Sequence, residues 1–228
     1  MTSHLPGLLS LALVLATTAP AQGADWPQWF GPNRDGQAAE TRSLAGTWTD
    51  KGPPTRWSRE LGAGFSSFAV VDKTGYTMAT DGPHVAVVAF DVGTGADRWR
   101  VRIGSGYEDR MGGDGPRATP TVDGDRVFTL GPNGELVALD KATGRLVWIH
   151  HLVHQLGGEI PKWGYSTSPL VADGRVYVDV GGPKGHGVVA FSREDGKVLW
   201  KTGAYKAGYS SPVKLTLAGA PQIVFFTA

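Results

Sequence analysis

Cysteine is absent from the 228 residues of the chain. This absence excludes a disulfide framework, thiolate metal ligands, a cysteine nucleophile and a lipidated amino-terminal cysteine. An excess of charge of one sign is also missing, because 22 Lys and Arg residues face 21 Asp and Glu residues and the formal net charge is +1. A chain so balanced has no long-range field that gathers polyanions, and nucleic acid is not an expected partner.

Long apolar runs are missing as well. Residues 5–18 form an apolar run that is too short to span a bilayer, and Ala19-Pro20-Ala21 follows it. This pattern predicts a signal peptide over residues 1–21, although that stretch contains no Lys or Arg for the usual positive start. We therefore expect export, a leader segment over residues 22–54, and a mature protein without a membrane span after signal cleavage.

Turn-forming residues are abundant, with 33 Gly and 15 Pro. This composition disfavours helical bundles. Hydrophobic residues make up 41% of the chain, which is enough for a packed core and argues against wholesale disorder. The length predicts one domain or part of one.

One eleven-residue unit occurs three times, as AFDVGTGADRW, ALDKATGRLVW and AFSREDGKVLW. Its Ala, Gly and Trp keep the same offsets in every copy, at Ala89, Gly95 and Trp99, at Ala138, Gly144 and Trp148, and at Ala190, Gly196 and Trp200. A second unit, Ser/Thr-Pro followed by Asp-Gly, begins at Thr119 and Ser168, and its start recurs at Ser211. The tryptophan series opens with Trp57, and successive members are 42, 49 and 52 residues apart, a period of propeller blades or helical solenoids.

The segments between turn signals are short, rich in Val, Phe, Leu and Thr, and often alternate with period two, so they are predicted to be strands. The fold class is therefore all-β, a β-propeller of four-stranded antiparallel blades over residues 55–228. We expect a lone outer strand at 55–61, full blades at 65–104, 117–152 and 166–204, and two strands of a fourth blade at 209–227. This count predicts an incomplete, amino-terminal part of a larger propeller. Trp99, Trp148 and Trp200 are expected to be buried between neighbouring blades.

The unit Ala-x-Asp-x-x-x-Gly-x-x-x-Trp resembles the tryptophan-docking motif of the pyrroloquinoline-quinone-like (quinoprotein-type) β-propeller repeat. The third position is Asp in the family pattern, and this chain keeps Asp91 and Asp140 but has Ser192 in the last copy. The leader ADWPQWFGPNRDG is similar to the start of secreted bacterial members of this group. The resemblance implies a periplasmic or secreted location.

Candidate binding loops are the connections between successive blades, at 104–117, 153–165 and 201–209, since the propeller gathers them on one face. The first contains the oxygen donors Glu108, Asp109 and Asp114 and the candidate anion binders Arg110 and Arg117. These carboxylates lack a recognisable calcium-ligand spacing. A solvated loop is the favoured interpretation.

The second loop offers an aromatic and cationic rim for a planar or sugar-like ligand, at Lys162, Trp163 and Tyr165. Packing of this loop onto the blade is an equally strong alternative. His150, His151 and His154 suggest zinc, but neighbouring side chains on a strand point to opposite faces, so no metal site is predicted.

Catalytic patterns are not found. Ser211-x-x-Lys214 falls in a predicted strand, and neither a nucleophile-elbow nor a phosphate-loop motif occurs. The favoured function is a non-catalytic exported propeller that binds a protein or small-molecule ligand on its loop face, with no cofactor. One alternative is the amino-terminal part of a dehydrogenase that uses pyrroloquinoline quinone and calcium, although the adjacent cysteine pair of many alcohol-oxidising relatives is absent. A second alternative is an envelope protein assembly factor, which the missing lipid-bearing cysteine disfavours.

Overall fold

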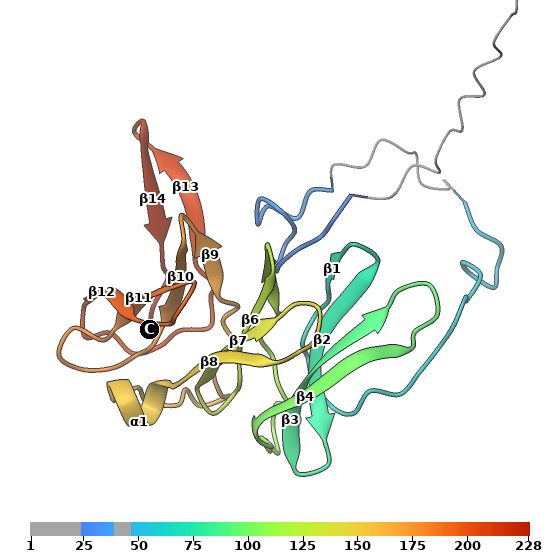
Figure 1. The fold of residues 1–228 in the computed structure, drawn as a ribbon, viewed down its shortest axis with the longest axis horizontal. Coiled ribbons are helices and arrows are strands. Elements are labelled where there is room, and N and C mark those ends of the chain that lie inside the picture. Colours follow the sequence, from blue (N-terminus) through green and yellow to red (C-terminus); the bar gives the residue numbers. More distant parts are fainter. Residues whose placement is uncertain (1–23, 39–46) are drawn as a thin grey trace, which may run out of the picture.

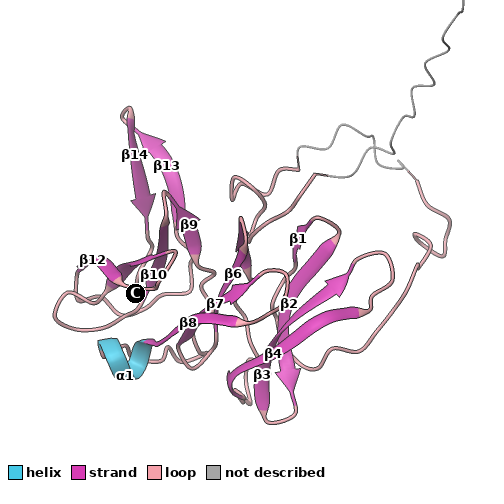
Figure 2. Cartoon of the chain, viewed as in Figure 1, coloured by secondary structure: helices cyan, strands magenta, loops and turns pink. Residues whose placement is uncertain are grey.

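A computed structural model of the chain describes residues 24–38 and 47–228 (Figure 1). The predicted signal peptide lies outside the described residues. Over the described part, antiparallel strands dominate and one short helix is present (Figure 2). None of its helices is long and apolar enough to cross a membrane.

Three four-stranded antiparallel sheets follow one another along the chain, and in each the spatial order of the strands is their order in sequence. The first sheet, here called blade 1, contains β1 (Ala69–Val71), β2 (Thr74–Asp81), β3 (His84–Asp91) and β4 (Asp97–Ser105). Blade 2 contains β5 (Thr121–Asp123), β6 (Arg126–Leu130), β7 (Glu135–Asp140) and β8 (Leu146–His151). Blade 3 contains β9 (Leu170–Ala172), β10 (Arg175–Asp179), β11 (Val188–Ser192) and β12 (Val198–Thr202). A two-stranded hairpin follows, made of β13 (Val213–Leu217) and β14 (Ala220–Val224).

This arrangement is the predicted β-propeller architecture with an incomplete set of blades. Period-two alternation explains how one strand serves two interfaces. On β7, Val137 and Leu139 belong to the core shared with blade 1, whereas Leu136 and Ala138 belong to the core shared with blade 3. A smaller core joins blade 3 to the hairpin.

The repeated tryptophans dock onto the following blade. Each indole Nε1 donates a hydrogen bond to the main-chain oxygen of the fourth residue of the next unit, from Trp57 to Val92 (2.9 Å), from Trp99 to Lys141 (3.0 Å) and from Trp148 to Arg193 (3.1 Å). The glycine of that unit lies against the ring, since a Cβ at Gly95, Gly144 or Gly196 would come within 2.6 to 2.9 Å of it. These glycines also have φ between 72° and 76°, in the left-handed region that favours glycine. Both the contact with the ring and the backbone conformation therefore require glycine.

The small alanine of each unit lies opposite its own tryptophan on the neighbouring strand. The pairs are Ala89 with Trp99, Ala138 with Trp148 and Ala190 with Trp200. All three alanines are fully buried. A larger side chain at these positions would push the neighbouring sheets apart.

The Ser/Thr-Pro units form a hydrogen-bonded series along the inner ends of the blades. The Ser67 N–H donates to Thr119 Oγ1 (3.2 Å), the Thr119 N–H donates to Ser168 Oγ (2.9 Å), and the Ser168 N–H donates to Ser211 Oγ (2.8 Å). Each hydroxyl therefore satisfies a main-chain donor of the preceding blade. The repeated Ser/Thr joins blade to blade at the inner rim, as the tryptophan does at the outer strands.

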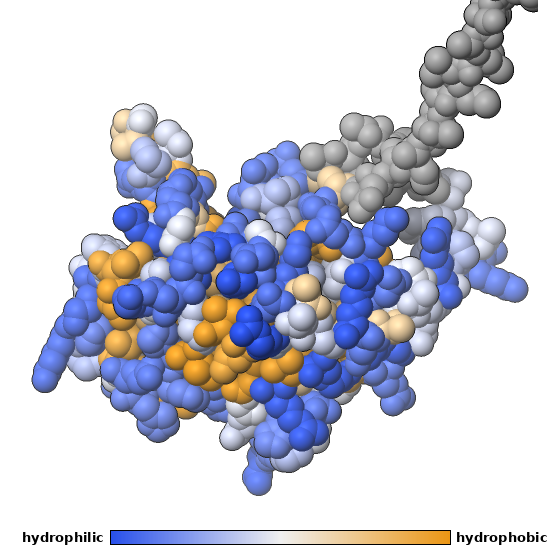
Figure 3. All heavy atoms as spheres, in the orientation of Figure 1, coloured by the Kyte–Doolittle hydropathy of each residue, from blue (hydrophilic) through white to orange (hydrophobic). Residues whose placement is uncertain are grey.

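Three sequence expectations need correction. Trp200 is not buried between blades, because the described residues place no docking unit beyond it and 49% of its surface is exposed. Figure 3 shows hydrophobic surface at the position of β12, where Val198 and Leu199 are 41% and 53% exposed. Residues 55–61 form no strand, although Trp57 docks as a member of the series. The predicted loop after blade 2 begins with a helix, α1 (Leu152–Leu156), which packs through the buried Leu152.

Candidate functional site

The three connections between blades meet on one face of the molecule, as expected for antiparallel blades. The Tyr107 hydroxyl donates to the Lys162 main-chain oxygen (3.0 Å), which joins the first connection to the second. The Trp163 N–H donates to the Tyr209 hydroxyl (3.3 Å), and the two rings lie 5.4 Å apart, which joins the second to the third. We call the surface formed by Tyr107, Met111, Lys162, Trp163 and Tyr209 the loop face.

The acidic residues of the first connection hold its backbone. The Asp109 carboxylate accepts hydrogen bonds from the Met111 N–H (2.8 Å) and the Gly112 N–H (3.1 Å). These donors, and then the Arg117 charge, hold the pKa of Asp109 below its ordinary value. Asp114 accepts a hydrogen bond from the Asp109 N–H (2.9 Å). One oxygen of each carboxylate is therefore engaged within the loop, whereas the buried Asp109 Oδ2 has no hydrogen-bond partner among the described residues and lies 3.6 Å from an Arg117 nitrogen.

Arg117, expected to bind an anion, is instead a structural clamp. Its guanidinium lies between the rings of Phe65 and Tyr107, at 5.3 and 5.2 Å from their centroids. It donates to the main-chain oxygens of Gly113 (2.9 Å) and Gly115 (3.1 Å). These contacts fix the position of the guanidinium within the loop. Arg110 of the same loop is exposed.

Tyr165 does not belong to the rim that was predicted for the second connection. Only 1% of its surface is exposed, and its hydroxyl donates to the Val180 main-chain oxygen (2.7 Å) in the core between blades 2 and 3. Packing against the blade decides its position. Lys162 and Trp163 do remain exposed, and the Lys162 ammonium lies 5.3 Å from the Trp163 ring centroid.

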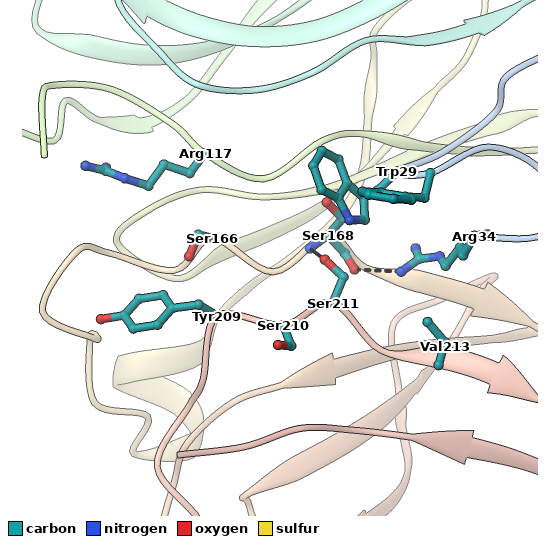
Figure 4. Close-up of a pocket in the computed structure, with 10 residues that line it drawn as sticks. Trp29, Arg34, Arg117, Ser166, Ser168, Tyr209, Ser210, Ser211 and Val213 are labelled. Carbon is teal, nitrogen blue, oxygen red and sulfur yellow. Dashed lines mark hydrogen bonds between the residues drawn. The ribbon is translucent and has the colours of Figure 1, made fainter. Parts of the chain in front are cut away.

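A cavity of about 420 Å³ opens beside these loops at the inner ends of the blades (Figure 4). The leader supplies one wall, with Trp29, Phe30 and Arg34. The other walls carry hydroxyl groups and one cationic clamp, from Arg117, Ser166, Ser168, Tyr209, Ser210 and Ser211. The buried Ser166 hydroxyl accepts or donates no hydrogen bond within the described residues.

Arg34 is the residue that sequence reasoning missed. Its guanidinium donates to the main-chain oxygens of Pro212 (2.8 Å), Ser168 (3.3 Å) and Pro169, and to the side chain of Gln28 (2.9 Å). Burial lowers the pKa of Arg34 to about 10, so the group stays charged at neutral pH. A lone arginine among the aromatic and turn residues of the leader was the available signal.

The leader reaches every sheet through this residue and its neighbours. The Trp26 backbone pairs with Val70 of β1, and the Val122 N–H of β5 donates to the Pro27 main-chain oxygen (2.8 Å). Arg34 then binds the segments that lead into β9 and β13. The leader is thus a strap across the inner ends of the blades.

The histidine cluster does not converge. The His150 ring contacts Gly196 O (2.7 Å) and Gln155 Oε1 (2.9 Å), on the side of β8 that faces blade 3. The His151 and His154 rings lie 6.4 Å apart. Residues 24–38 and 47–228 contain no group of three His, Asp or Glu side chains placed to hold a metal ion.

The geometry does not support a catalytic pair of Ser211 and Lys214. Lys214 is paired with the Asp173 carboxylate (2.8 Å), and Ser211 Oγ accepts the Ser168 N–H. Two serines of the cavity, Ser168 and Ser211, belong to the inner-rim series. Over the described part of the chain this site is suited to binding and has no evident nucleophile with a base.

Comparisons with known proteins agree with this fold. A family model described as outer membrane protein assembly factor BamB matches residues 83–228. A comparison with curated protein sequences gives no match. Among solved structures, BamB from Moraxella catarrhalis is 21% identical, with 65% of this chain and 40% of that chain covered and a TM-score of 0.44.

Quinohemoprotein alcohol dehydrogenase from Comamonas testosteroni is 20% identical, with 77% of this chain and 26% of that chain covered and a TM-score of 0.50. The chain thus spans less than half the length of either structure, and identities this low show the fold alone. The family match covers more than half of the chain and includes all three docking units. The chain belongs to the BamB family of β-propellers built from pyrroloquinoline-quinone-like repeats.

Proposed function

We propose that the chain is a non-catalytic scaffold of the bacterial cell envelope that binds a partner protein on its loop face. The observation that carries this proposal is the exposure of large apolar side chains on a face braced by hydrogen bonds. Met111 is 81% exposed, Tyr209 44% and Trp163 40%. Tyr, Trp and Met are the residue types enriched at protein interfaces.

The polar groups of the same face support binding and not catalysis. The first connection is held by hydrogen bonds of its own side chains Asp109, Asp114 and Arg117. The face therefore keeps its shape without a partner and offers rigid aromatic contacts, which lowers the entropy cost of association.

The family match supports the envelope setting, because its description names outer membrane protein assembly. The apolar segment at residues 5–18 followed by small residues supports export. A protein of the outer-membrane assembly machinery is accordingly the class of partner that we infer. The description of the family match does not name the quinone-dependent alternative.

Site-specific photocrosslinking in envelope-derived membranes tests the proposal. A photoreactive phenylalanine analogue replaces Trp163 or Met111 in the full chain, and Leu146 serves as the control position. Leu146 is 47% exposed and lies at the opposite end of β8 from the loop face. We expect one discrete protein adduct from positions 163 and 111 and none from position 146.

The adduct from position 111 should also weaken in the Tyr209→Ala variant and persist in Leu146→Ala. Equal adducts from the loop face and from position 146 would contradict the proposal. Stoichiometric uptake of pyrroloquinoline quinone with calcium, accompanied by alcohol-dependent dye reduction, would favour the dehydrogenase alternative.

A further inference from the structure

Glu135 is a buried carboxylate with an unsatisfied oxygen. It begins β7, and only 7% of its surface is exposed. No group in the described ranges donates a hydrogen bond to its Oε2. Burial of a charged carboxylate without a partner is costly, so such a group requires a proton, a cation or a donor from outside.

The carboxylate lines a cavity of about 410 Å³ at the loop end of blades 1 and 2. Glu135 and His151 are directly paired residues of β7 and β8, so both side chains lie on the sheet face toward blade 1. His154 of α1 and Asn133 of the turn before β7 line the same cavity. Two strands, a turn and a helix thus bring these polar groups together.

Two glycines make room for this carboxylate. A Cβ at Gly104 of β4 would collide with the Glu135 carboxyl group, and so would one at Gly131. At Gly104 the main chain of blade 1 therefore lies closer to the carboxylate than it could at a residue that carries a Cβ. The pocket is part of the packing between two blades and does not depend on a surface loop alone.

The available polar groups are mainly acceptors. Asn133 donates its amide hydrogens to the main-chain oxygens of Ser105 (3.0 Å) and Gly106 (3.4 Å), which leaves its oxygen for a ligand. The Glu135 carboxylate is acceptor-only when charged, and neutral histidine rings each offer one acceptor nitrogen. Lysine ammonium and arginine guanidinium groups carry donors and no acceptor, so they complement this lining.

We propose that the Glu135 pocket binds the cationic side chain of a lysine or arginine from a partner polypeptide. That the cation comes from a partner polypeptide rests on the proposed function. The pocket shares a wall, formed by Ser105 and Gly106, with the cavity beside Tyr107, and Tyr107 belongs to the loop face. Burial raises the pKa of the Glu135 carboxyl, and backbone hydrogen bonds oppose this rise. A bound cation would hold the carboxylate in its charged form.

A bound proton and a metal ion are the competing solutions. A protonated Glu135 would need no ligand. A metal ion would need a third ligand from the chain, and the described residues place no such group of three His, Asp or Glu. The experiment must therefore separate a cationic side chain from both.

Histidine-ring NMR of the full mature chain can do so, with His151 and His154 as reporters. The probes are N-acetyl-arginine methylamide and N-acetyl-lysine methylamide. N-acetyl-citrulline methylamide is the matched control, because it is nearly isosteric with the arginine probe but uncharged. We expect saturable shifts of both histidine signals with at least one cationic probe and none with the citrulline probe.

The Glu135→Gln variant should weaken this binding by about tenfold or more, because a charge-assisted hydrogen bond is lost. Glu108→Gln is the control variant, since Glu108 is an exposed acid on the adjacent connection. It should bind as the unmodified chain does.

Equal shifts with the citrulline probe, or the absence of saturable shifts, would overturn the proposal even if Glu135→Gln failed to fold. Tighter binding of Zn²⁺ that depends on Glu135 would assign a metal site instead. Tighter binding of putrescine than of both blocked amino acids would assign the pocket to free polyamines. Failure here would leave the Trp163 crosslink intact, whereas failure of the proposed function would remove the crosslink and leave the binding of the small probes.

Discussion

The indole Nε1 of Trp148 donates a 3.1 Å hydrogen bond to the main-chain oxygen of Arg193, in the turn of the next blade. The ring also lies against Gly196 and beside Phe191. Trp148 is 8% exposed, whereas Trp200, at the same place in its own unit, is 49% exposed. The two residues therefore separate the effect of docking from the effect of residue type.

Trp148→Ala should lower the free energy of unfolding by about 3 to 5 kcal/mol, because it leaves a large cavity between two sheets. Trp200→Ala should cost less than about 1 kcal/mol, since about half of the residue's surface is already exposed to solvent. Urea denaturation of both variants measures the difference. A loss below 1 kcal/mol for Trp148→Ala would mean that the docked ring does not hold the blades together.

The inner-rim series predicts a second contrast. Ser168→Ala removes the acceptor for the buried Thr119 N–H and should cost roughly 1 to 3 kcal/mol. Ser168→Thr keeps the hydroxyl, as Thr119 does in the preceding blade, and should retain most of the stability. Thermal unfolding of the two variants checks this, and equal losses would show that the hydroxyl itself is unimportant.

The strap formed by the leader depends on Arg34. Arg34→Met should lower the free energy of unfolding by about 2 to 4 kcal/mol, because several main-chain oxygens lose a charged donor. Arg56→Met, at an exposed position, should change it by less than about 0.5 kcal/mol. Denaturant titration of both variants gives the result. A neutral Arg34→Met variant would contradict the role of the strap.

Asp179 predicts a pH dependence of stability. It is 1% exposed, its Oδ2 accepts the Gly208 N–H (2.8 Å), and burial raises its pKa to about 6. The folded carboxyl therefore holds its proton more tightly than the unfolded one, whose pKa is near 3.8. Its contribution to stability is fully present below about pH 4 and is lost as the pH rises through 6.

Asp179→Asn removes this titration. The variant should gain roughly 2 to 3 kcal/mol relative to the unmodified chain between pH 4 and pH 7. Carboxyls with a lowered pKa, such as Asp91 beside Arg98, act in the opposite direction but are common to both proteins and cancel in the difference. Urea denaturation across this range gives the comparison, and a difference that stays flat with pH would show that Asp179 does not titrate as described.

Much of the fold was predictable because its signals are local and repeated. Blade 2 was expected over residues 117–152, and the structure has its four strands between Thr121 and His151. A glycine and a tryptophan, Gly144 and Trp148 in blade 2, mark the last turn and the last strand of every copy. The alternation of apolar residues marks the other strands of each blade. Alternation also separates His150 from His151, and the structure places them on opposite sides of β8.

The candidate site was less predictable, because its contacts join residues far apart in the chain. Arg117 carries the guanidinium group that commonly binds anions, and only its position between Phe65 and Tyr107 shows that it is a clamp. Tyr165 follows an exposed tryptophan, and only the approach of Val180 shows that it is buried. Arg34 lies in the leader that resembles other family members but was given no role there, and Glu135 belongs to no motif.

The sequence by itself determined the repeat, the strand periodicity and the turn glycines, and through them the propeller architecture. These features follow from backbone geometry within a few residues, so they can be predicted from the amino-acid sequence. Only the tertiary structure decided which polar groups are satisfied and which face a cavity, because that depends on the neighbours that adjacent blades bring together. The docked Trp148 and the exposed Trp200 show the distinction. Both follow the same local pattern, but Trp148 meets the docking unit of blade 3, whereas the described residues place no docking unit against Trp200.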